Sequence, residues 1–337
     1  MSPARRSVCY GIGRNAFGVE KVHSNIEHKG RLSDAIRAGL LVSLLMMLLA
    51  APVLLLGKDT TTDAQGQRAF TTSEASDAIK YHIPVIEAMA DEWPDVDIVN
   101  YRSATSPGYH LALAAAVNAG VNDAGLRWIN LIAGCAFVGL VGAFAAWAPG
   151  WRAGALVSLP IVVSPYVLSS TCWITTDNAA LAFVALAIGC AAFGNGSTRA
   201  SALGGLGATL AVAIRQLHIW PIATLSLSMK AGSGMLARFP IVRDVAAKLG
   251  LEPPSEKINW TRFLVGSVAV LAPIALLGFF VWKWQGLMPP MYREKHASGV
   301  SWSMPALALS LSAIFGGALL AHAWEGLKTL RARDPWV

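Results

Sequence analysis

The chain has 337 residues, of which 54% are hydrophobic and only 14% are charged, and its mean hydropathy is +0.49. Soluble domains are usually about 25% charged, so this composition indicates a membrane protein rather than a soluble domain. In a membrane protein, the net charge of +7 is best explained by Lys and Arg in cytoplasmic loops. The sequence lacks the basic stripe with interleaved aromatic residues that would indicate a nucleic-acid-binding surface.

Residues 1–37 predict a basic cytoplasmic tail that leads into an uncleaved first span. The first apolar run starts near Ala38, which is too far along the chain for a secretory signal peptide, and no clear small-residue cleavage site follows it. The positive charges of the tail are Arg5, Arg6, Arg14, Lys21, Lys29, Arg31 and Arg37.

Several apolar runs are long enough to be membrane spans, since a helix needs about 20 apolar residues to cross a bilayer. Residues 201–229 are apolar but interrupted by Arg215 and Gln216, so they form either one long helix with a buried arginine or two short helices that meet at that pair. The other runs are 38–57, 128–148, 153–172, 178–194 (slightly short), 263–284 and 303–323.

Loop charges select between the two alternatives for 201–229. With the N-terminal tail in the cytoplasm, loop 58–127 lies outside, and this loop is acidic. The segment 230–262 is basic and therefore belongs inside, which requires 201–229 to cross twice with Arg215 at the outer surface. If 201–229 crosses once instead, every later segment inverts.

We therefore predict an all-α integral membrane protein, a polytopic helical bundle of about eight membrane segments with an outer-face helical loop. The transmembrane domain is 38–324, with 58–127 as the outer loop, and the tails 1–37 and 325–337 are cytoplasmic.

Two further segments predict helices outside the spans. Residues 109–121 are apolar but too short to cross, so we expect a helix at the outer membrane surface. Residues 231–258 predict a cytoplasmic amphipathic helix and a Pro-rich turn.

The unusual polar residues gather on the outer side of this topology. Ionisable groups at a membrane edge are costly, so several that converge indicate a functional site. Structural explanations stay open: Asp177 suits helix capping, and the tyrosines suit interfacial anchoring. The candidate catalytic residues are Asp77 and His82, and the candidate substrate-binding residues are Tyr81, Tyr101, Thr105, Tyr109, His110, Asp177, Asn178, Arg215, Gln216, His218, Arg293, Lys295 and His296.

These residue types suit the transfer of a sugar from a lipid-linked phosphate. The forked guanidinium of Arg215 is suited to a phosphate diester. Asp77 would be the general base that takes the proton of an acceptor hydroxyl as it attacks the anomeric carbon. One base is enough for an inverting displacement, because the leaving group is a stable phosphate whose charge histidines would neutralise.

No metal or disulfide pattern is visible. The cysteines Cys9, Cys135, Cys172 and Cys190 show no CxxC or Cys/His spacing, so we expect neither a disulfide framework nor zinc. We expect no cofactor; a divalent ion bound by Asp77 and Asp177 is an alternative that the sequence leaves open.

Three stretches carry a resemblance to a known family. They are YHIPVIEAMADEWPDVDIVNYRSATSPGYHL (81–111), then ITTDNAALAF (174–183) with AIRQLHIWPI (213–222), and FFVWKWQGLMPPMYREKHASGVSW (279–302). In order and spacing they resemble the GT-C superfamily of membrane glycosyltransferases. Within it they are most similar to the dolichyl-phosphate-glucose-dependent alpha-1,2-glucosyltransferase family.

The resemblance implies roles for particular residues. Arg215 and Gln216 would hold the donor phosphate, and His82, Asp177 and His296 would line the site. That family has an Asp-Glu pair directly before its Phe-His-Ile-Pro run, whereas this chain has Ala and Ile there, and its nearest acid is Asp77.

The resulting hypothesis is a polyprenyl-phosphate-sugar-dependent, inverting hexosyl- or pentosyltransferase. The Ala- and Gly-rich composition is typical of a high-GC bacterium, so we expect the inner membrane, with the active site on the non-cytoplasmic face. The expected partners are the donor lipid, membrane lipid and an acceptor, which is a lipid-linked glycan, a cell-envelope polymer or a secreted molecule; no nucleic acid is expected. The alternatives are a transporter or flippase, which usually buries polar groups inside spans of repeated halves, and a non-catalytic membrane scaffold.

Overall fold

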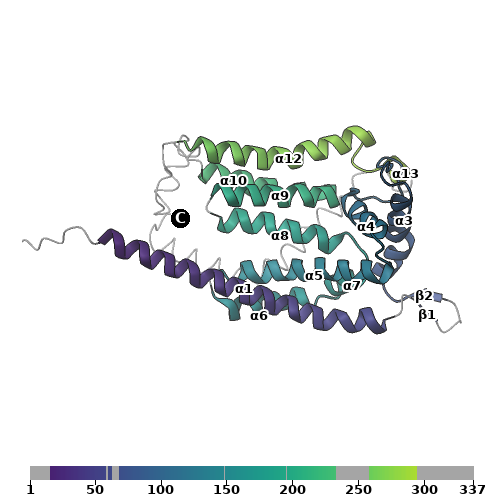
Figure 1. Cartoon of the computed structure of the whole chain (residues 1–337), viewed down its shortest axis with the longest axis horizontal. Coiled ribbons are helices and arrows are strands. Elements are labelled where there is room, and N and C mark those ends of the chain that lie inside the picture. Colours follow the sequence, from purple (N-terminus) through teal and green to yellow (C-terminus); the bar gives the residue numbers. More distant parts are fainter. Residues whose placement is uncertain are drawn as a thin grey trace, which may run out of the picture.

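The computed structural model describes residues 16–57, 60–62, 68–147, 149–194, 196–232 and 258–293 (Figure 1). Long helices lie side by side along one direction, and a group of short helices covers one end of them (Figure 1). We call this end the capped end. It carries the candidate site.

Among the described residues, three helices are long and apolar enough to cross a membrane: α1 (Ala16–Leu56, with its apolar part from Gly30), α5 (Asp123–Ala145) and α12 (Trp260–Trp284). Large apolar side chains on them face outward, as lipid-facing residues do, including Leu40 (67% exposed) and Trp282 (64%). The described part of the chain is therefore that of a helical membrane protein. A small antiparallel hairpin, β1 (Thr60–Thr62) and β2 (Arg68–Phe70), follows α1.

The predicted span 153–172 is a bent pair of helices. α6 (Trp151–Val162) and α7 (Pro165–Cys172) meet at an angle of 76° and count together as one span at most. The cause is local: proline disfavours helical backbone in the residue before it, and Ser164 is extended, with φ −61° and ψ 122°.

Residues 201–229 form two helices rather than one. α9 (Thr198–Ile214) ends at Arg215, whose backbone is extended (φ −142°, ψ 109°), and α10 (Ile222–Gly232) follows the short 3₁₀ turn η2 (Gln216–Ile219). The prediction of two short helices that meet at Arg215 is therefore confirmed.

The count of eight membrane segments is not confirmed. α8 (Asp177–Phe193) and α9 are apolar but have only 17 residues each, and the described residues hold three spanning helices, or four if the bent pair is one span. The expected eighth segment 303–323 lies outside the described residues, as do the tail 325–337 and most of the predicted amphipathic segment 231–258.

Small residues let the long helices approach closely. A Cβ added at Gly39 of α1 would lie 2.9 Å from the carbonyl oxygen of Gly139 on α5, and one at Gly205 of α9 would lie 2.4 Å from Cβ of Ala269 on α12. Close backbone contact of this kind is a main source of helix association in lipid, where burial of apolar surface gives little driving force.

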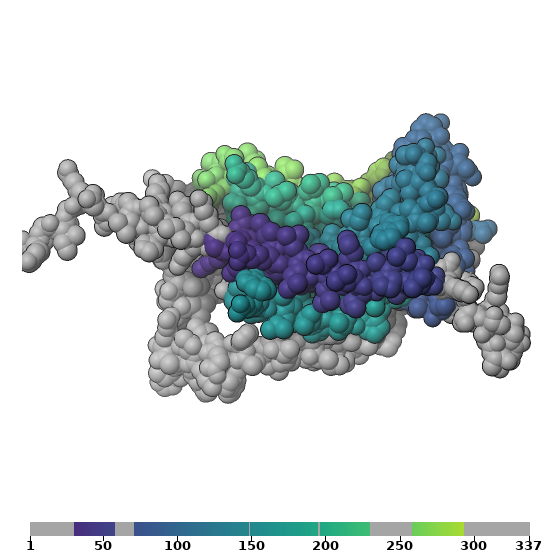
Figure 2. All heavy atoms as spheres, turned by 60° about the horizontal axis from the view of Figure 1, so that its bottom comes forward, coloured from purple at the N-terminus to yellow at the C-terminus, as the bar shows by residue number. Residues whose placement is uncertain are grey.

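Short helices build the capped end: α2 (Ser73–Asp77), the π-helical turn η1 (Ala78–His82), α3 (Ile83–Asp91), α4 (Gly108–Asn118) and α13 (Pro290–Arg293). In Figure 2 these segments project at one end of the molecule, beyond the long α1 helix. α4 confirms the helix predicted at 109–121. The buried ring of Trp284 fastens α12 to this end, because its Nε1 donates to the Ile98 carbonyl at 2.9 Å.

Candidate functional site

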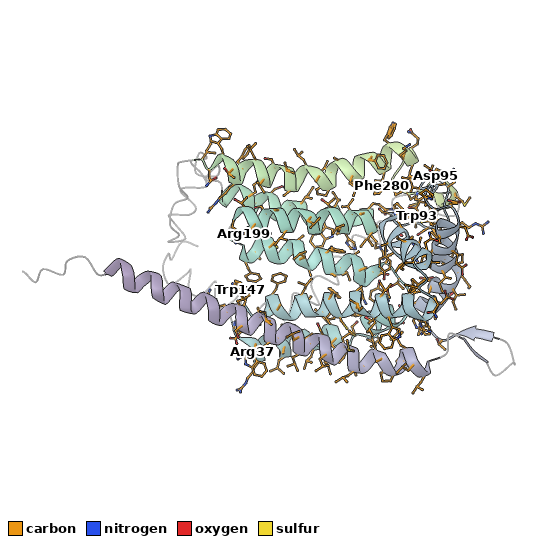
Figure 3. The ribbon with its side chains drawn as sticks, viewed as in Figure 1. Arg37, Trp93, Asp95, Trp147, Arg199 and Phe280 are labelled. Carbon is orange, nitrogen blue, oxygen red and sulfur yellow. The ribbon has the colours of Figure 1, made fainter. Side chains whose placement is uncertain are left out.

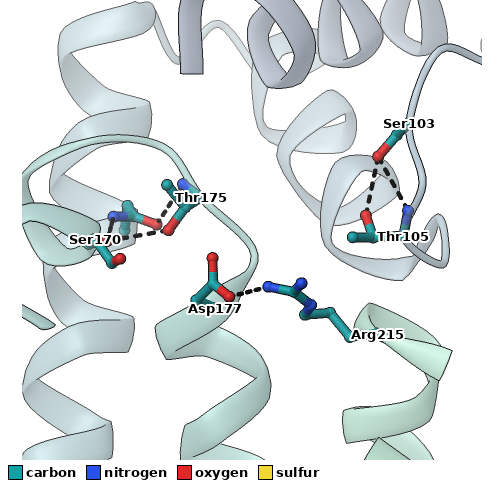
Figure 4. Close-up of polar contacts among 7 residues, drawn as sticks. Ser103, Thr105, Ser170, Thr175, Asp177 and Arg215 are labelled. Atoms are coloured by element: carbon teal, nitrogen blue, oxygen red, sulfur yellow. Dashed lines mark hydrogen bonds and ion pairs between the residues drawn. The ribbon is translucent and has the colours of Figure 1, made fainter. Parts of the chain in front are cut away.

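Asp177 and Arg215 form an ion pair at the capped end (Figure 4). Asp177 is the first residue of α8, and Arg215 follows the last residue of α9, so the pair joins neighbouring tips of two antiparallel helices. An acid at a helix N-terminus and a cation at a C-terminus are each favoured by the helix dipole. The Arg215 and Asp177 side chains are 28% and 22% exposed, so a ligand can reach them. Among the described residues, the guanidinium is hydrogen-bonded only through Nη1.

His82 and His110 form a second polar pair. Nδ1 of His82, at the end of η1, lies 2.9 Å from Nε2 of His110 on α4. Burial and, to a smaller extent, the charge of Arg215 lower the pKa of His82 to about 4. Burial likewise holds the pKa of His110 well below its ordinary value. Both rings are therefore neutral near pH 7, so His82 supplies no positive charge to a departing phosphate.

His218 belongs to the same neutral group of histidines. It lies in η2, three residues after Arg215. Burial first, and then the charge of Arg215, lower the pKa of His218 to about 4. Arg215 is thus the cation that faces a ligand among these residues.

Asp77 lies at the same end, at the junction of α2 and η1. Burial raises its pKa, the carboxylate of Glu74 raises it further, and Lys80 opposes the two. Glu74 is held by Ser169 of α7, whose Oγ donates to Oε2 at 2.8 Å. Tyr166, at the start of α7, lies within electrostatic range of Asp77, Glu74 and Arg215 together. Asp77 and Arg215 therefore share one end of the bundle.

Tyr81 and Tyr292 lie beside Asp77. Their ring centroids are 6.3 Å apart in an edge-to-face arrangement, and Tyr292 is within electrostatic range of Asp77. Tyr81 is exposed, which leaves its ring available to a ligand.

Gln216 is used within the protein. Its Oε1 accepts from Ser106 Oγ at 3.1 Å, and its Nε2 donates to the carbonyls of Ala104 (2.7 Å) and Leu287 (2.9 Å). One amide thus ties the segment before α4 and the segment after α12 to the turn that carries Arg215. This geometry supports a positioning role, in place of the expected direct contact with phosphate.

Four other predicted binding residues also make internal hydrogen bonds. Tyr101 donates to the Thr105 carbonyl at 2.5 Å, and Thr105 Oγ1 pairs with Ser103 Oγ at 3.0 Å (Figure 4). Tyr109 donates to Asn130 Oδ1 at 2.9 Å, and Asn178 donates to Thr171 Oγ1 at 2.8 Å. These four residues shape the walls of the site.

The lining of an apolar cavity of about 400 Å³ includes residues close in sequence to both members of the ion pair. α4, α5, α8 and α9 line it, and its wall includes Ile214, the neighbour of Arg215, and Ala179, two residues after Asp177. Ala182 of α8 and Leu210 of α9 also line it.

The last three predicted site residues are not placed. The backbone of Arg293 ends α13, and its side chain is not described; Lys295 and His296 lie outside the described residues. Within the part of the chain that the structure describes, no group of three or more His, Cys, Asp or Glu side chains could hold a metal ion.

Asn130 and Glu74 are site residues that the sequence analysis missed. Asn130 is a single polar residue within the apolar run 128–148, and its full burial beside the α7–α8 turn comes from tertiary packing. Glu74 lies among many outer-loop acids, and only its contact with Ser169 distinguishes it.

Comparisons with known proteins add no relative. No family model matches the chain, no curated protein matches it significantly, and no solved structure matches it significantly.

Proposed function

We propose that the chain is a membrane glycosyltransferase of the GT-C kind, which transfers a sugar from a polyprenyl phosphate to an acceptor on the non-cytoplasmic face. The acceptor class is a lipid-linked glycan, a cell-envelope polymer or a secreted molecule. One observation carries the proposal: a partly exposed arginine lies at the capped end, above an apolar cavity and on the same side as Asp77.

Arg215 suits the donor phosphate. Its Nη1 is paired with Asp177, while Nη2 and Nε make no hydrogen bond within the described residues. A guanidinium binds a phosphate through two parallel N–H groups, and Asp177 holds it in place for that contact. Neutral His82 and His218 beside it add no competing charge.

The cavity suits the lipid part of the donor. It is apolar, holds about 400 Å³, and is lined by Ile214, the neighbour of Arg215, and by Ala179, two residues after Asp177. A phosphate on Arg215 would place the first isoprene units against Ile214, Ala182 and Leu210, where burial of each CH₂ contributes about 0.8 kcal/mol.

Asp77 suits the general base. Its raised pKa makes it a stronger proton acceptor than a fully solvated aspartate. In the proposed step an acceptor hydroxyl oxygen bonds to the anomeric carbon, and the hydroxyl proton passes to Asp77. The bond from that carbon to the phosphate oxygen breaks, and polyprenyl phosphate leaves with the electron pair.

Asp77→Asn tests this assignment, because the amide keeps the shape of the carboxyl and cannot take a proton. We expect loss of sugar transfer by at least about 10²-fold, with unchanged membrane insertion. The assay follows sugar moved from undecaprenyl-phosphate hexoses by purified protein in nanodiscs. The matched control is Asp91→Asn, an exposed outer-segment acid, which should keep full activity.

Retained transfer by Asp77→Asn removes the base assignment. Movement of a lipid-linked or polar solute across vesicles, with no sugar transfer by the unaltered protein, would indicate a transporter instead. Mass spectrometry of the lipid-linked sugars that accumulate in cells lacking the protein identifies the donor sugar.

A further inference from the structure

Two exposed tryptophans on α12 mark where the bilayer meets the protein. Trp260 and Trp282 are about six turns apart on one helix, so both rings project from the same face. They are separated by about 33 Å at a helical rise of about 1.5 Å per residue. The exposed side chains of Val268 and Leu271 lie between them. Tryptophan prefers the two interfaces of a bilayer, whose hydrocarbon core is about 30 Å thick, so α12 crosses that core between these two residues.

A charge at the capped end of α12 supports the same boundary. Lys283 directly follows Trp282, and its Nζ lies 5.1 Å from the centroid of the Trp282 ring. An ammonium group is costly in hydrocarbon and favourable at the headgroups. The hydrocarbon core therefore ends close to Trp282.

Arg215 lies at the depth of this boundary. Gly205 of α9 packs against Ala269 of α12, and both helices run from there toward the capped end (Figure 1). Measured from that contact, Arg215 lies about 15 Å and Trp282 about 20 Å toward the capped end, at about 1.5 Å per residue. The guanidinium is therefore close to the depth of the lipid phosphates in the adjoining leaflet.

The apolar cavity extends from this depth into the hydrocarbon of the same leaflet. Leu186 is the lining residue of α8 furthest from the capped end, and it lies about 13 Å along the helix from Asp177. Half of a hydrocarbon core is about 15 Å. The cavity therefore reaches from the headgroup boundary almost to the middle of the bilayer, which is the depth that one leaflet of lipid tails occupies.

The cavity is open at the surface of the protein. Two of its lining residues, Ala112 of α4 and Ala136 of α5, are exposed. An alanine side chain is one carbon, so an alanine that lines the cavity and is also exposed marks an opening. Ala136 lies about 9 Å further into α5 than Asn130, whose amide binds the turn before Asp177. The opening beside Ala136 is therefore at the depth of lipid tails.

The wall of the cavity suits a hydrocarbon chain. Among the described residues that line it, Tyr109 alone has a polar side chain, and the Tyr109 hydroxyl donates to Asn130 Oδ1 at 2.9 Å. A polar solute would find no hydrogen-bonding partner there and would lose its hydration. A volume of about 400 Å³ suits part of one chain.

We propose that the cavity is a lateral lipid site. A polyprenyl phosphate of the adjoining leaflet enters sideways through the opening beside Ala136, lays its tail in the cavity and keeps its phosphate at headgroup depth on Arg215. The lipid never leaves the bilayer. The choice of a polyprenyl chain rests on the proposed function.

Nitroxide labels on single cysteines test the depth of the site without any assay of transfer. The full chain is held in nanodiscs of dioleoylphosphatidylcholine, and the relative access of oxygen and of a water-soluble nickel chelate gives the depth of each label. We expect the label of Leu271→Cys to be deepest and the labels of Trp282→Cys and Leu217→Cys to lie near the boundary. A Leu217→Cys label as deep as that of Leu271→Cys, or as accessible to the chelate as that of Trp93→Cys, overturns the proposal.

Ala136→Phe tests the opening, because its ring would fill the entrance without touching Arg215. We expect the Kd for undecaprenyl phosphate in these nanodiscs to rise about tenfold. The matched control is Ala202→Phe, an exposed alanine at a different apolar cavity, between α9 and α12, which should leave this Kd unchanged. Ala112→Phe, at the same opening, is the second test variant should Ala136→Phe fail to insert. An unchanged Kd in the opening variant, or an equal rise in the control, overturns the proposal.

Two competitors identify the ligand. Excess inorganic phosphate should leave the Kd for undecaprenyl phosphate unchanged, because it lacks the tail; a rise would show that the phosphate alone accounts for binding and would overturn the cavity site. Exchange of part of the phosphatidylcholine for dioleoylphosphatidylglycerol should also leave it unchanged, and a rise would assign the cavity to an ordinary phospholipid and overturn the polyprenyl site.

The outcome is separable from that of the proposed function. If undecaprenyl phosphate binds as expected and the unaltered protein transfers no sugar, the proposed function fails and the lateral lipid site stands. If sugar transfer is found and Ala136→Phe leaves the donor KM unchanged, the lateral lipid site fails and the proposed function stands.

Discussion

Arg215 can serve a ligand because its backbone leaves the helix at the point where its side chain meets Asp177. The extended φ and ψ of this residue end α9, and the ion pair holds the guanidinium between two helix tips. A charge in this position would be costly inside a span, but here it is partly exposed. The same pair also fixes the distance between α8 and α9, so binding and stability have to be measured separately.

Arg215→Ala should raise the KM for the polyprenyl-phosphate donor by about 10- to 100-fold, because a charge-assisted hydrogen bond to phosphate contributes about 1.5–3 kcal/mol. Initial rates at fixed acceptor concentration give this KM. Arg199→Ala, at the opposite end of the bundle (Figure 3), is the matched control and should leave it unchanged. A donor KM that does not change in Arg215→Ala would count against a phosphate contact.

The sequence predicts isolated charges better than buried amides. Arg215 stands out because it interrupts an apolar run, Asp177 stands out because it directly precedes one, and the structure brings the two together. Asn130 has no such signal, because a single asparagine in an apolar helix can be a functional residue or merely a tolerated polar residue, and the sequence does not distinguish the two. Gln216 shows the opposite error: it adjoins Arg215 in sequence, but its amide points into the protein and binds Ala104 and Leu287.

At the scale of elements, the turn between α7 and α8 positions Asp177, and α5 holds that turn. Nδ2 of Asn130 donates to the carbonyls of Ser170 (2.8 Å), Thr171 (3.0 Å) and Trp173 (2.7 Å). An amide has two N–H groups, so one of them is shared between two carbonyls. The last carbonyls of a helix lack partners within the helix, and Asn130 supplies them from a neighbouring helix.

Asn130→Leu should lower the free energy of unfolding by about 2–4 kcal/mol, because it keeps the volume and leaves buried carbonyls and the Tyr109 hydroxyl without their partner. Thermal unfolding in detergent gives the change. Asn118→Ala is the control, since it removes one hydrogen bond from an exposed asparagine and should cost less than about 1 kcal/mol. Equal losses in the two variants would contradict the role of Asn130 as the anchor of the turn.

The boundaries of elements followed from the sequence where a local signal was strong. Arg215 marked the break between α9 and α10 correctly. The bend between α6 and α7 also had a signal, Ser164 before Pro165, but the apolar run 153–172 hid it because hydropathy carries no information on backbone angle. The helix α1 begins at Ala16, before the predicted span, because a helix continues through a basic segment that an apolar pattern cannot detect.

At the scale of the whole molecule, acidic side chains gather at the capped end, which also carries the basic residues Lys80 and Arg215. Arg37 and Arg199 lie toward one end, and Trp93 and Asp95 lie at the capped end (Figure 3). Segment 83–97 adds Glu87, Asp91, Glu92 and Asp97 to the capped end, whereas Arg152 and Arg262 lie in the first turns of α6 and α12. The positive-inside rule counts Lys and Arg rather than acids, and basic residues lie at both ends, so the side that the capped end faces has to be measured.

Single-cysteine labelling tests this orientation directly. The background needs its native cysteines replaced, and these are Cys9, Cys135, Cys172 and Cys190. Leu217, which is 68% exposed, is a better reporter of the α9–α10 turn than its neighbour Gln216, which is 5% exposed.

Trp93→Cys and Leu217→Cys should react with a membrane-impermeant maleimide added to intact cells, because both positions are exposed at the capped end. Arg37→Cys and Arg199→Cys should react only after the membrane is opened, because they lie toward the other end (Figure 3). A reversed pattern would place the candidate site in the cytoplasm, where a donor lipid of the outer leaflet cannot reach it. Labelling of positions 93 and 217 from opposite sides would separate Asp77 from Arg215 and leave neither with a partner for sugar transfer.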